Sequence, residues 1–439
     1  MSNDLYIYFS TIIFILLGGI LAFFWFKRFE TALFFFGLSP LVSTIFFQNV
    51  IETESISTEA TIGTGGYLRA ILLISLGIVG ISKYFRNYSK FEGKIPLQFF
   101  FFGIFILFSF FSVYYSLDQR FSLIRVTLLF SVFGFLIGFY SWLQEDGNLK
   151  KALNTLFILV SIIVVVTVLS ILVVPSRVWW WKADRLIGFW EHPNSFGAFC
   201  MLVYPILMWK YYNIKKSNKF IVLIPGLITI LLHILSGSRT TLLTSFIGIV
   251  IWILLEKNWI KLFFSTIILG LTVVILIEFS PTSFTRQGDS KITDLSSRED
   301  IWTSALVFVK ENPLLGYGYG VEGKIFQDES KLDLGTTFIE RNVRQSMHNG
   351  YLSIIVGVGI LGLLFWLLVL LYPLFQGFQM PYNTFKTYAL VSMIMVLITN
   401  FVESALTGYS AATDIFFWIS WVISGNILLG NNKLNSNYN

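Results

Sequence analysis

Long apolar runs separated by short polar segments repeat along almost the whole chain. A helix needs about 20 apolar residues to cross the ~30 Å hydrocarbon core of a bilayer, and runs of roughly that length predict about 12–13 transmembrane helices. The expected spans are residues 5–26, 31–48, 67–82, 96–115, 121–143, 152–174, 195–212, 220–235, 240–255, 259–278, 349–372, 386–403 and 411–429. The runs lack the alternation of membrane β-strands. The pattern therefore predicts an all-α, polytopic integral membrane protein.

Composition agrees with this fold class. The 439 residues are 55% hydrophobic and only 13% charged, whereas a soluble domain carries about 25% charged residues. The net charge of +6 lies in the loops between runs, as the positive-inside rule expects, so it does not indicate a nucleic-acid partner. The run from Leu5 to Phe26 has no basic segment or cleavage site before it, and we expect a retained helix there. A single cysteine, Cys200, allows no disulfide framework.

One connection is much longer than the others, and it divides the chain. It extends from Glu278 to His348, far beyond the usual loop length. Its segment "SSREDIWTSALVFVKENPLLG" predicts an amphipathic helix that ends before Pro313. We therefore expect one integrated domain with three parts: an N-terminal transmembrane bundle (1–278), a large extracytoplasmic loop with a helix (279–348) and C-terminal transmembrane helices (349–439).

The two faces of the membrane differ in their basic residues. Lysines gather in alternate loops, which predicts that these loops are cytoplasmic and that the long loop lies outside. The outer side instead carries arginines: Arg69, Arg120, Arg125, Arg177, Arg185, Arg239, Arg286, Arg298, Arg341 and Arg344. Because the planar guanidinium binds phosphate through two donors at once, this asymmetry predicts a phosphorylated ligand on the outer face. The alternative is interfacial snorkelling with salt bridges to loop carboxylates.

Four stretches near the predicted outer face carry candidate chemistry. They are "RLIGFWEHPNSFGAFCML" with Arg185, His192 and Asn194; "SGSRTTLLTSFIG" with Arg239; "SSREDIW" with Arg298; and "MHNGYLSIIVGVGILG" with His348. His-Pro-Asn alone is also typical of a helix-entry turn with proline at the first helical position. A further stretch, "GYGYG" at Gly316–Gly320, follows no strand and predicts a loop, not a dinucleotide site.

Together and in this order, the four stretches resemble the O-antigen ligase and polymerase family of bacterial envelope glycosyltransferases over Arg185 to Gly362. The resemblance implies a GT-C-type membrane enzyme that transfers a glycan from undecaprenyl pyrophosphate to an acceptor without a metal. It places Arg239 and Arg298 at the pyrophosphate and His348 at the acceptor. It also makes Arg185, His192 and Asn194 candidates for substrate binding.

The residues themselves are compatible with those roles. Two arginines can stabilise a departing pyrophosphate, and a histidine at a helix N-terminus, where the dipole disfavours an imidazolium, suits a general base. A structural cap or interface histidine is the alternative for His348. The best candidates for a metal-binding set of carboxylates are Asp289, Asp294, Glu299 and Asp300. They have no recognisable metal-ligand spacing, so we expect neither a metal nor a cofactor.

The sequence thus predicts a glycosyltransferase of the bacterial cytoplasmic (inner) membrane whose active face is extracytoplasmic, in O-antigen, capsule or exopolysaccharide synthesis. Its expected partners are a polyprenyl-pyrophosphate-linked oligosaccharide donor, a glycan or glycolipid acceptor and the lipid bilayer. A polymerase is favoured over a ligase because no feature marks a lipid A-core acceptor site. A transporter of polysaccharide or lipid-linked sugar is the alternative, but the predicted midplane lacks ionisable residues and no inverted repeat is visible.

Overall fold

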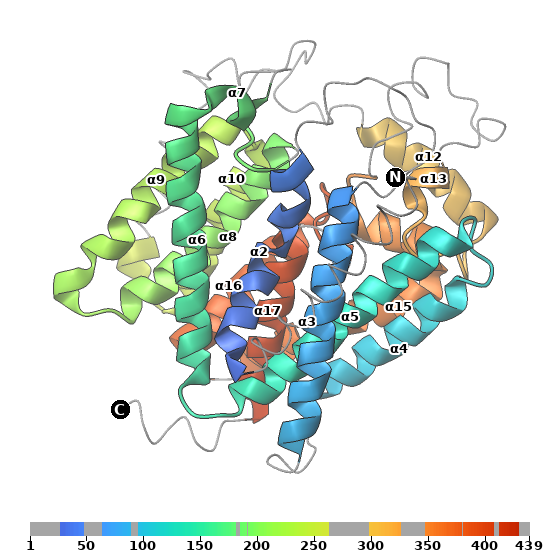
Figure 1. Ribbon diagram of the computed structural model, residues 1–439, viewed down its shortest axis with the longest axis horizontal. Coiled ribbons are helices and arrows are strands. Elements are labelled where there is room, and N and C mark those ends of the chain that lie inside the picture. The colour runs from blue at the N-terminus through green and yellow to red at the C-terminus, as the bar shows by residue number, and fades with distance from the viewer. Residues whose placement is uncertain are drawn as a thin grey trace, which may run out of the picture. The chain divides into compact units, whose positions relative to one another are not determined.

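The computed structural model describes residues 27–47, 64–88, 95–180, 185–190, 192–262, 298–325, 347–379, 381–407 and 412–429. The longer helices there are α2 (Phe29–Phe47), α3 (Thr64–Asn87), α4 (Leu97–Ser112), α5 (Gln119–Leu143), α6 (Asn148–Val173), α8 (Pro193–Tyr212), α9 (Phe220–Ser236), α10 (Arg239–Leu255), α12 (Arg298–Glu311), α15 (Gly350–Gln379), α16 (Thr384–Thr399) and α17 (Ala412–Leu429). Short α7 (Pro175–Val178), η3 (Lys216–Asn218) and α13 (Glu322–Ile325) complete the helices. Strands β1 (Trp179–Trp180) and β2 (Arg185–Leu186) pair antiparallel. The predicted all-α class is confirmed (Figure 1).

The helices coincide with the predicted membrane spans wherever the structure describes the residues. Five of them are long and apolar enough to cross a bilayer: Gly66–Asn87, Gln119–Leu143, Asn148–Val173, Lys216–Ser236 and Gly350–Gln379. Shorter apolar helices accompany them. Their outward faces carry exposed apolar side chains such as Leu107, Ile158 and Leu172, as a lipid-facing surface requires. The predicted span 5–26 lies outside the described residues, and so does the part of the predicted span 259–278 that follows residue 262.

The chain forms two compact units that alternate along the sequence. Unit 1 comprises Met1–Lys94 and Phe130–Ser236, and unit 2 comprises Ile95–Leu129 and Gly237–Asn439. Helix α5 therefore contributes its first residues to unit 2 and the remainder to unit 1. The predicted division at residues 278 and 348 concerns membrane topology and stays a prediction.

Unit 1 is held together by stacked aromatic rings and by small residues. The Phe135 ring lies 4.1 Å from Phe36 and 5.4 Å from Phe29, centroid to centroid. Nearby, Gly80 of α3 meets the backbone of α5 at Gly134 and Gly138 so closely that a Cβ at any of these glycines would press on the other helix. Small residues at such crossings let membrane helices approach each other. In the same unit, α8 packs along α9.

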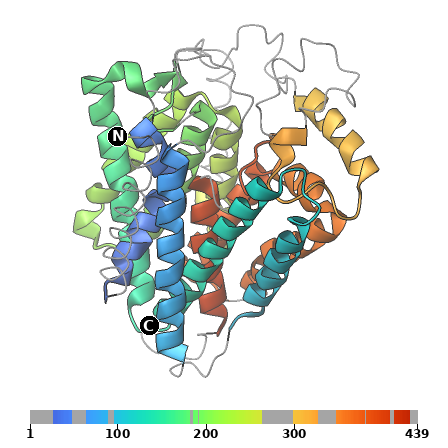
Figure 2. The ribbon, with the colours of Figure 1, turned by 45° about the vertical axis from the view of Figure 1, so that its right-hand side comes forward.

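Unit 2 is built around α4 and α15, which lie side by side in both views (Figures 1 and 2). Large rings fill the space between these helices and α17. Phe102 stacks on Trp418 at 4.5 Å, and Phe105 lies 4.5 Å from Trp366. The unit also contains α10, which packs along α16, and α12, which docks on α15. Helices α12 and α13 lie near the end of α15 at which it begins (Figure 2).

Helix α15 is interrupted in its interior. Residues 313–318, which overlap the start of the "GYGYG" loop, form hydrogen bonds with the backbone groups beside the interruption. Val358 and Gly359 leave the helical conformation, with φ values of −124° and +68°. The loop supplies partners for the backbone groups that this releases. Tyr317 N donates to Val356 O at 3.0 Å, Gly318 N to Gly357 O at 2.7 Å, and Ile360 N to Pro313 O at 2.9 Å. Irregular backbone inside a membrane protein needs such internal partners, so "GYGYG" is a structural loop, as predicted.

Candidate functional site

The segment "HNGY", His348 to Tyr351, places a histidine at the beginning of α15. Asn349 caps the helix, since its Oδ1 accepts from Leu352 N at 3.0 Å. His348 precedes the cap with φ +46°, in the left-handed region that few non-glycine residues adopt. Gly350 N donates to Asn400 O at 2.9 Å, and a Cβ at Gly350 would overlap the Asn400 side chain. Glycine at this position therefore lets the start of α15 contact the end of α16.

The loop that follows α16 supplies an acidic residue to the same place. Asn400 folds this loop back, because its Oδ1 accepts from Leu406 N at 2.8 Å. The ring of Phe401 lies 4.7 Å from that of Tyr351. These contacts fix both ends of the short segment that contains Glu403.

Helix α12 supplies a buried arginine. Arg298 is its first residue and is only 8% exposed. Trp302 Nε1, one turn later, donates to Met347 O at 3.0 Å and ties α12 to the residue before His348. An apolar cluster holds the rest of the helix against α15; its buried members are Ile301, Ala305, Phe308, Tyr317, Val321, Ile325, Met347 and Val356. The loop helix predicted from the sequence is thus confirmed, and it docks on α15.

Glu403 joins the predicted arginine and the predicted histidine. Its Oε1 lies 2.5 Å from Arg298 Nη2, and its Oε2 lies 3.1 Å from His348 Nδ1. An ionised carboxylate only accepts hydrogen bonds, so a neutral His348 ring bonded to it would carry its proton on Nδ1 and its lone pair on Nε2. Such a partner fixes the tautomer of a catalytic histidine. The side chains of His348 and Glu403 keep 24% and 17% of their surface exposed, which leaves this cluster accessible to a ligand.

Sequence reasoning missed Glu403 as a member of the site. It is one of the few ionisable residues at the predicted outer end of a span, and that was the available signal. Its pairing with a histidine 55 residues earlier depends on how α15 and α16 pack. His348 was predicted from the stretch that resembles the family, and its place at a helix N-terminus leaves the tautomer of the ring undetermined.

The other predicted residues fall into two places. Arg239 is the half-buried first residue of α10 in unit 2. Helix α10 packs along α16, with Gly248 against the Met395 side chain, and α16 ends four residues before Glu403. Arg239 therefore begins a helix that packs along α16, and the loop that contains Glu403 follows α16. The remaining candidates belong to unit 1.

Those unit 1 candidates form a local polar cluster. Arg185, only 3% exposed, donates from Nη2 to Asn194 Oδ1 at 2.9 Å and from Nε to Ser236 O at 2.8 Å. His192 caps α8, since its Nδ1 accepts from Asn194 N at 3.1 Å, and Pro193 begins the helix. The helix-entry turn considered for His-Pro-Asn is thus present. Ser236 is the last residue of α9, so Arg185 fixes the end of that helix.

Metal ligands were not expected from the sequence, and that expectation stays a prediction. In the described part of the chain, no three His, Cys, Asp or Glu side chains gather in a group suited to a metal ion. Asp289 and Asp294, two of the carboxylates considered, lie outside it.

Comparison with known proteins finds a family match over part of the chain. Residues 224–367 match the family model described as O-antigen ligase. The predicted resemblance to the O-antigen ligase family is confirmed. The matched region contains Arg239, Arg298 and His348, whereas Glu403 follows it and Arg185 precedes it.

A curated relative extends the similarity. The ComP-specific O-oligosaccharyltransferase of Acinetobacter baylyi is 24% identical over 301 residues, which are 64% of this chain and 53% of that protein. The chain thus matches about half the length of this relative. The O-antigen ligase region and this relative both connect the chain with proteins named for glycan transfer.

Proposed function

We propose that this protein is a membrane glycosyltransferase that moves a glycan from a polyprenyl pyrophosphate carrier to an acceptor hydroxyl on the extracytoplasmic face. In the proposed step, the acceptor oxygen forms a bond with the anomeric carbon and its proton passes to His348 Nε2. The bond between that carbon and the pyrophosphate oxygen breaks, and the carrier leaves with the electron pair. We propose the polyprenyl pyrophosphate carrier from the family resemblance and the extracytoplasmic face from the lysine distribution.

The observation that best supports this proposal is the shared contact of Arg298 and His348 with Glu403. The reaction needs a cation beside the leaving group and a base beside the acceptor, held a short distance apart. Glu403 contacts the cation, Arg298, through one carboxylate oxygen and the base, His348, through the other. Its negative charge also stabilises the imidazolium that forms when His348 takes the proton.

Arg298 and Arg239 are the proposed pyrophosphate ligands. A guanidinium has five N–H donors, and the contact with Glu403 engages Arg298 through Nη2. We assign its other donors to the phosphate oxygens. Arg298 also begins α12, where the helix N-terminus favours an anion.

Arg185, His192 and Asn194 have a supporting role in this proposal. Arg185 directs two of its donor atoms to Asn194 and Ser236, and His192 caps α8. We therefore propose that they hold the end of α9 and the start of α8 in place, and that their effect on substrate binding is indirect.

A transporter is the alternative function, and the interruption of α15 is the feature that bears on it. Transporters use discontinuous helices to direct backbone groups at a substrate. In α15, however, the carbonyls of Val356 and Gly357 and the N–H of Ile360 bond to the 313–318 loop. The interruption thus has a structural explanation that requires no transported ligand.

The test is a transfer assay with purified protein in nanodiscs or proteoliposomes and a lipid-linked repeat unit as donor. Lengthening of the glycan on its carrier would identify a polymerase, and transfer to a glycolipid would identify a ligase. Transfer to a protein would identify an oligosaccharyltransferase, the activity for which the curated relative is named. Substrate that crosses the bilayer unchanged would support transport and overturn the proposal. Activity should survive a chelator, since we propose a metal-independent reaction.

A further inference from the structure

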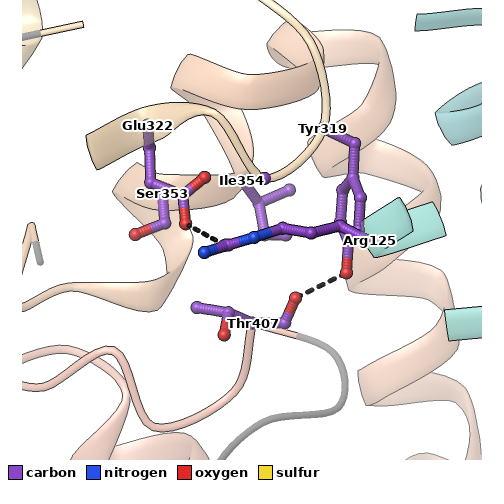
Figure 3. A pocket seen from close by; sticks show the side chains of 7 residues that line it. Arg125, Tyr319, Glu322, Ser353, Ile354 and Thr407 are labelled. Atoms are coloured by element: carbon purple, nitrogen blue, oxygen red, sulfur yellow. Dashed lines mark hydrogen bonds and ion pairs between the residues drawn. The ribbon is translucent and has the colours of Figure 1, made fainter. Parts of the chain in front are cut away.

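The second tyrosine of the "GYGYG" loop, Tyr319, is bonded to the loop that contains Glu403. Its hydroxyl donates to Thr407 O at 2.7 Å, a hydrogen bond that Figure 3 shows. The bond lies at a small pocket, the Arg125 pocket, which is lined by Arg125, Tyr319, Gly320, Glu322, Ser353, Ile354 and Thr407. The chemistry proposed above assigns no role to Tyr319, although all of these residues belong to the same unit as the proposed site.

Tyr319 itself has a fixed position. It is only 2% exposed, and α4 and the start of α5 bind its backbone. Its N donates to Ser112 Oγ at 3.0 Å, and its O accepts from Ser122 Oγ at 2.9 Å. The glycines on either side, Gly318 and Gly320, have φ values of +111° and +82°, which other residues rarely adopt. The loop therefore directs the Tyr319 hydroxyl to one place.

The residue that Tyr319 contacts closes the loop after α16. Both backbone groups of Thr407 are bonded, since its N donates at 3.0 Å to Oδ1 of Asp414, a buried residue in the first turn of α17. The residue before it, Leu406, donates to Asn400 Oδ1 at 2.8 Å. Residues 400–407, which we call the Glu403 segment, are therefore held at both ends.

The Glu403 segment determines whether one carboxylate can contact two helices at once. Its Oε1 lies 2.5 Å from Arg298 Nη2 on α12, and its Oε2 lies 3.1 Å from Nδ1 of His348, just before α15. Hydrogen bonds weaken steeply when their geometry is lost, and a misplacement of about 1 Å can cost on the order of 10²-fold in rate. Both contacts therefore depend on the position of the Glu403 backbone.

We propose that Tyr319 is a positioning residue of the transferase, whose hydroxyl holds the Glu403 segment so that Glu403 reaches Arg298 and His348 together. The proposal rests on the transferase function above. Tyr319 acts through Glu403 and does not contact the donor or the acceptor. This role belongs to the Tyr319 side chain and is separate from the backbone hydrogen bonds that residues 313–318 form with α15.

A second tyrosine in the same loop provides a matched control. Tyr319→Phe and Tyr317→Phe each remove one hydroxyl, and Tyr317 Oη donates at 2.8 Å to Oε2 of Glu311, which does not belong to the proposed site. Because a hydrogen bond to a charged group is the stronger of the two kinds, Tyr317→Phe should lower the thermal stability at least as much as Tyr319→Phe. A difference between the variants at the site is then not a difference in overall stability.

Hydrogen–deuterium exchange measures the hold on the Glu403 segment without any need for activity. The sample is the full-length protein in nanodiscs, and the readout is the exchange rate of peptides that cover residues 400–407. Loss of one hydrogen bond should raise this rate by about twofold to tenfold in Tyr319→Phe. In Tyr317→Phe it should stay at the wild-type value.

The transfer assay shows whether the hydroxyl acts through Glu403. Tyr319→Phe should lower kcat by about twofold to tenfold, whereas Tyr317→Phe should keep the wild-type kcat. In the Glu403→Gln background, Tyr319→Phe should cause little further loss, because the contacts that it supports are already impaired. An independent structural effect would instead lower kcat by the same factor in both backgrounds.

The assignment is wrong if exchange of the Glu403 segment is unchanged in Tyr319→Phe, if both tyrosine variants change alike, or if the loss of kcat is the same in the Glu403→Gln background. Absence of transfer by the wild-type protein is a separate result. It would overturn the proposed function and the catalytic part of this inference, while the exchange rates would still show whether Tyr319 holds the segment.

Discussion

At the scale of single residues, the two oxygens of Glu403 organise the site. One contacts Arg298 and the other His348, so one carboxylate orients the proposed base and the proposed phosphate ligand together. Removal of its charge should therefore affect both halves of the reaction.

We expect Glu403→Gln to reduce kcat while the fold persists. The amide keeps the size of the side chain, but its NH₂ group donates and does not accept, so one of the two contacts, with Arg298 or with His348, loses its acceptor. Loss of a hydrogen bond to a charged group costs about 1.5–3 kcal/mol, or roughly tenfold to a hundredfold in rate if it acts in the transition state. Initial transfer rates measure this effect. Glu311→Gln is the control in the same unit, since Glu311 accepts from Tyr317 Oη through Oε2 at 2.8 Å and does not belong to the proposed site. Equal rates in the two variants would remove Glu403 from the site.

The pyrophosphate role of Arg298 and Arg239 predicts that lysine cannot replace them. Lysine retains the charge but lacks the planar fork, so each Arg→Lys variant should lose about tenfold to a hundredfold in kcat/KM. Arg177→Lys, on the exposed surface of α7, should retain wild-type turnover. Near-normal rates for both site variants would reduce these arginines to structural or interfacial roles.

At the scale of elements, α15 and the "GYGYG" loop depend on each other structurally. The helix carries the His348 segment at its beginning, and the "GYGYG" loop inserts at Val358 and Gly359. The same loop continues into the Arg125 pocket at Gly320. The interruption thus links the orientation of α15 to that of α12 and α13.

Gly359→Ala should destabilise the protein. Gly359 has φ +68°, and a Cβ there would overlap the backbone of Leu314, so we expect a loss of about 1–3 kcal/mol from backbone strain, with a further loss from the overlap. Thermal unfolding in detergent, followed by tryptophan fluorescence, measures the change. Gly226→Ala in α9 is the control, because its Cβ would meet Leu207 Cδ1 at 3.8 Å, an ordinary van der Waals contact. A Gly359→Ala variant as stable as that control would contradict the described interruption.

At the scale of the whole molecule, the apolar runs were sufficient to predict the helices. Helix formation in a membrane depends on local composition and length, and α12 followed from its own amphipathic pattern. Arg298 and His348 could be chosen because each belongs to a recognisable stretch. The role of Glu403, the interruption of α15 and the Arg125 pocket depend on contacts between distant segments. Tyr319 and Thr407, for example, are 88 residues apart, and no local pattern specifies such a contact.

The lysine distribution predicts which loops face the cytoplasm, and this sets the active face. Introduced cysteines test it in whole cells with a membrane-impermeant maleimide. Ser330→Cys, in the long connection between Glu278 and His348, should be labelled from outside, and Ser217→Cys only after permeabilisation. The native Cys200 is buried, so its background labelling should be low. The opposite result would invert the orientation and place the proposed site in the cytoplasm.

The most direct test of the central claim compares His348→Ala with His192→Ala in the transfer assay. Loss of the general base should lower the rate by about 10²–10⁴-fold, while binding of the lipid-linked donor stays near wild type. His192 caps α8, so His192→Ala should reduce stability or substrate placement and keep the pH dependence of its remaining activity. If His348→Ala keeps most of its activity and His192→Ala loses it, the base is His192 and the account of Arg298, Glu403 and His348 is wrong.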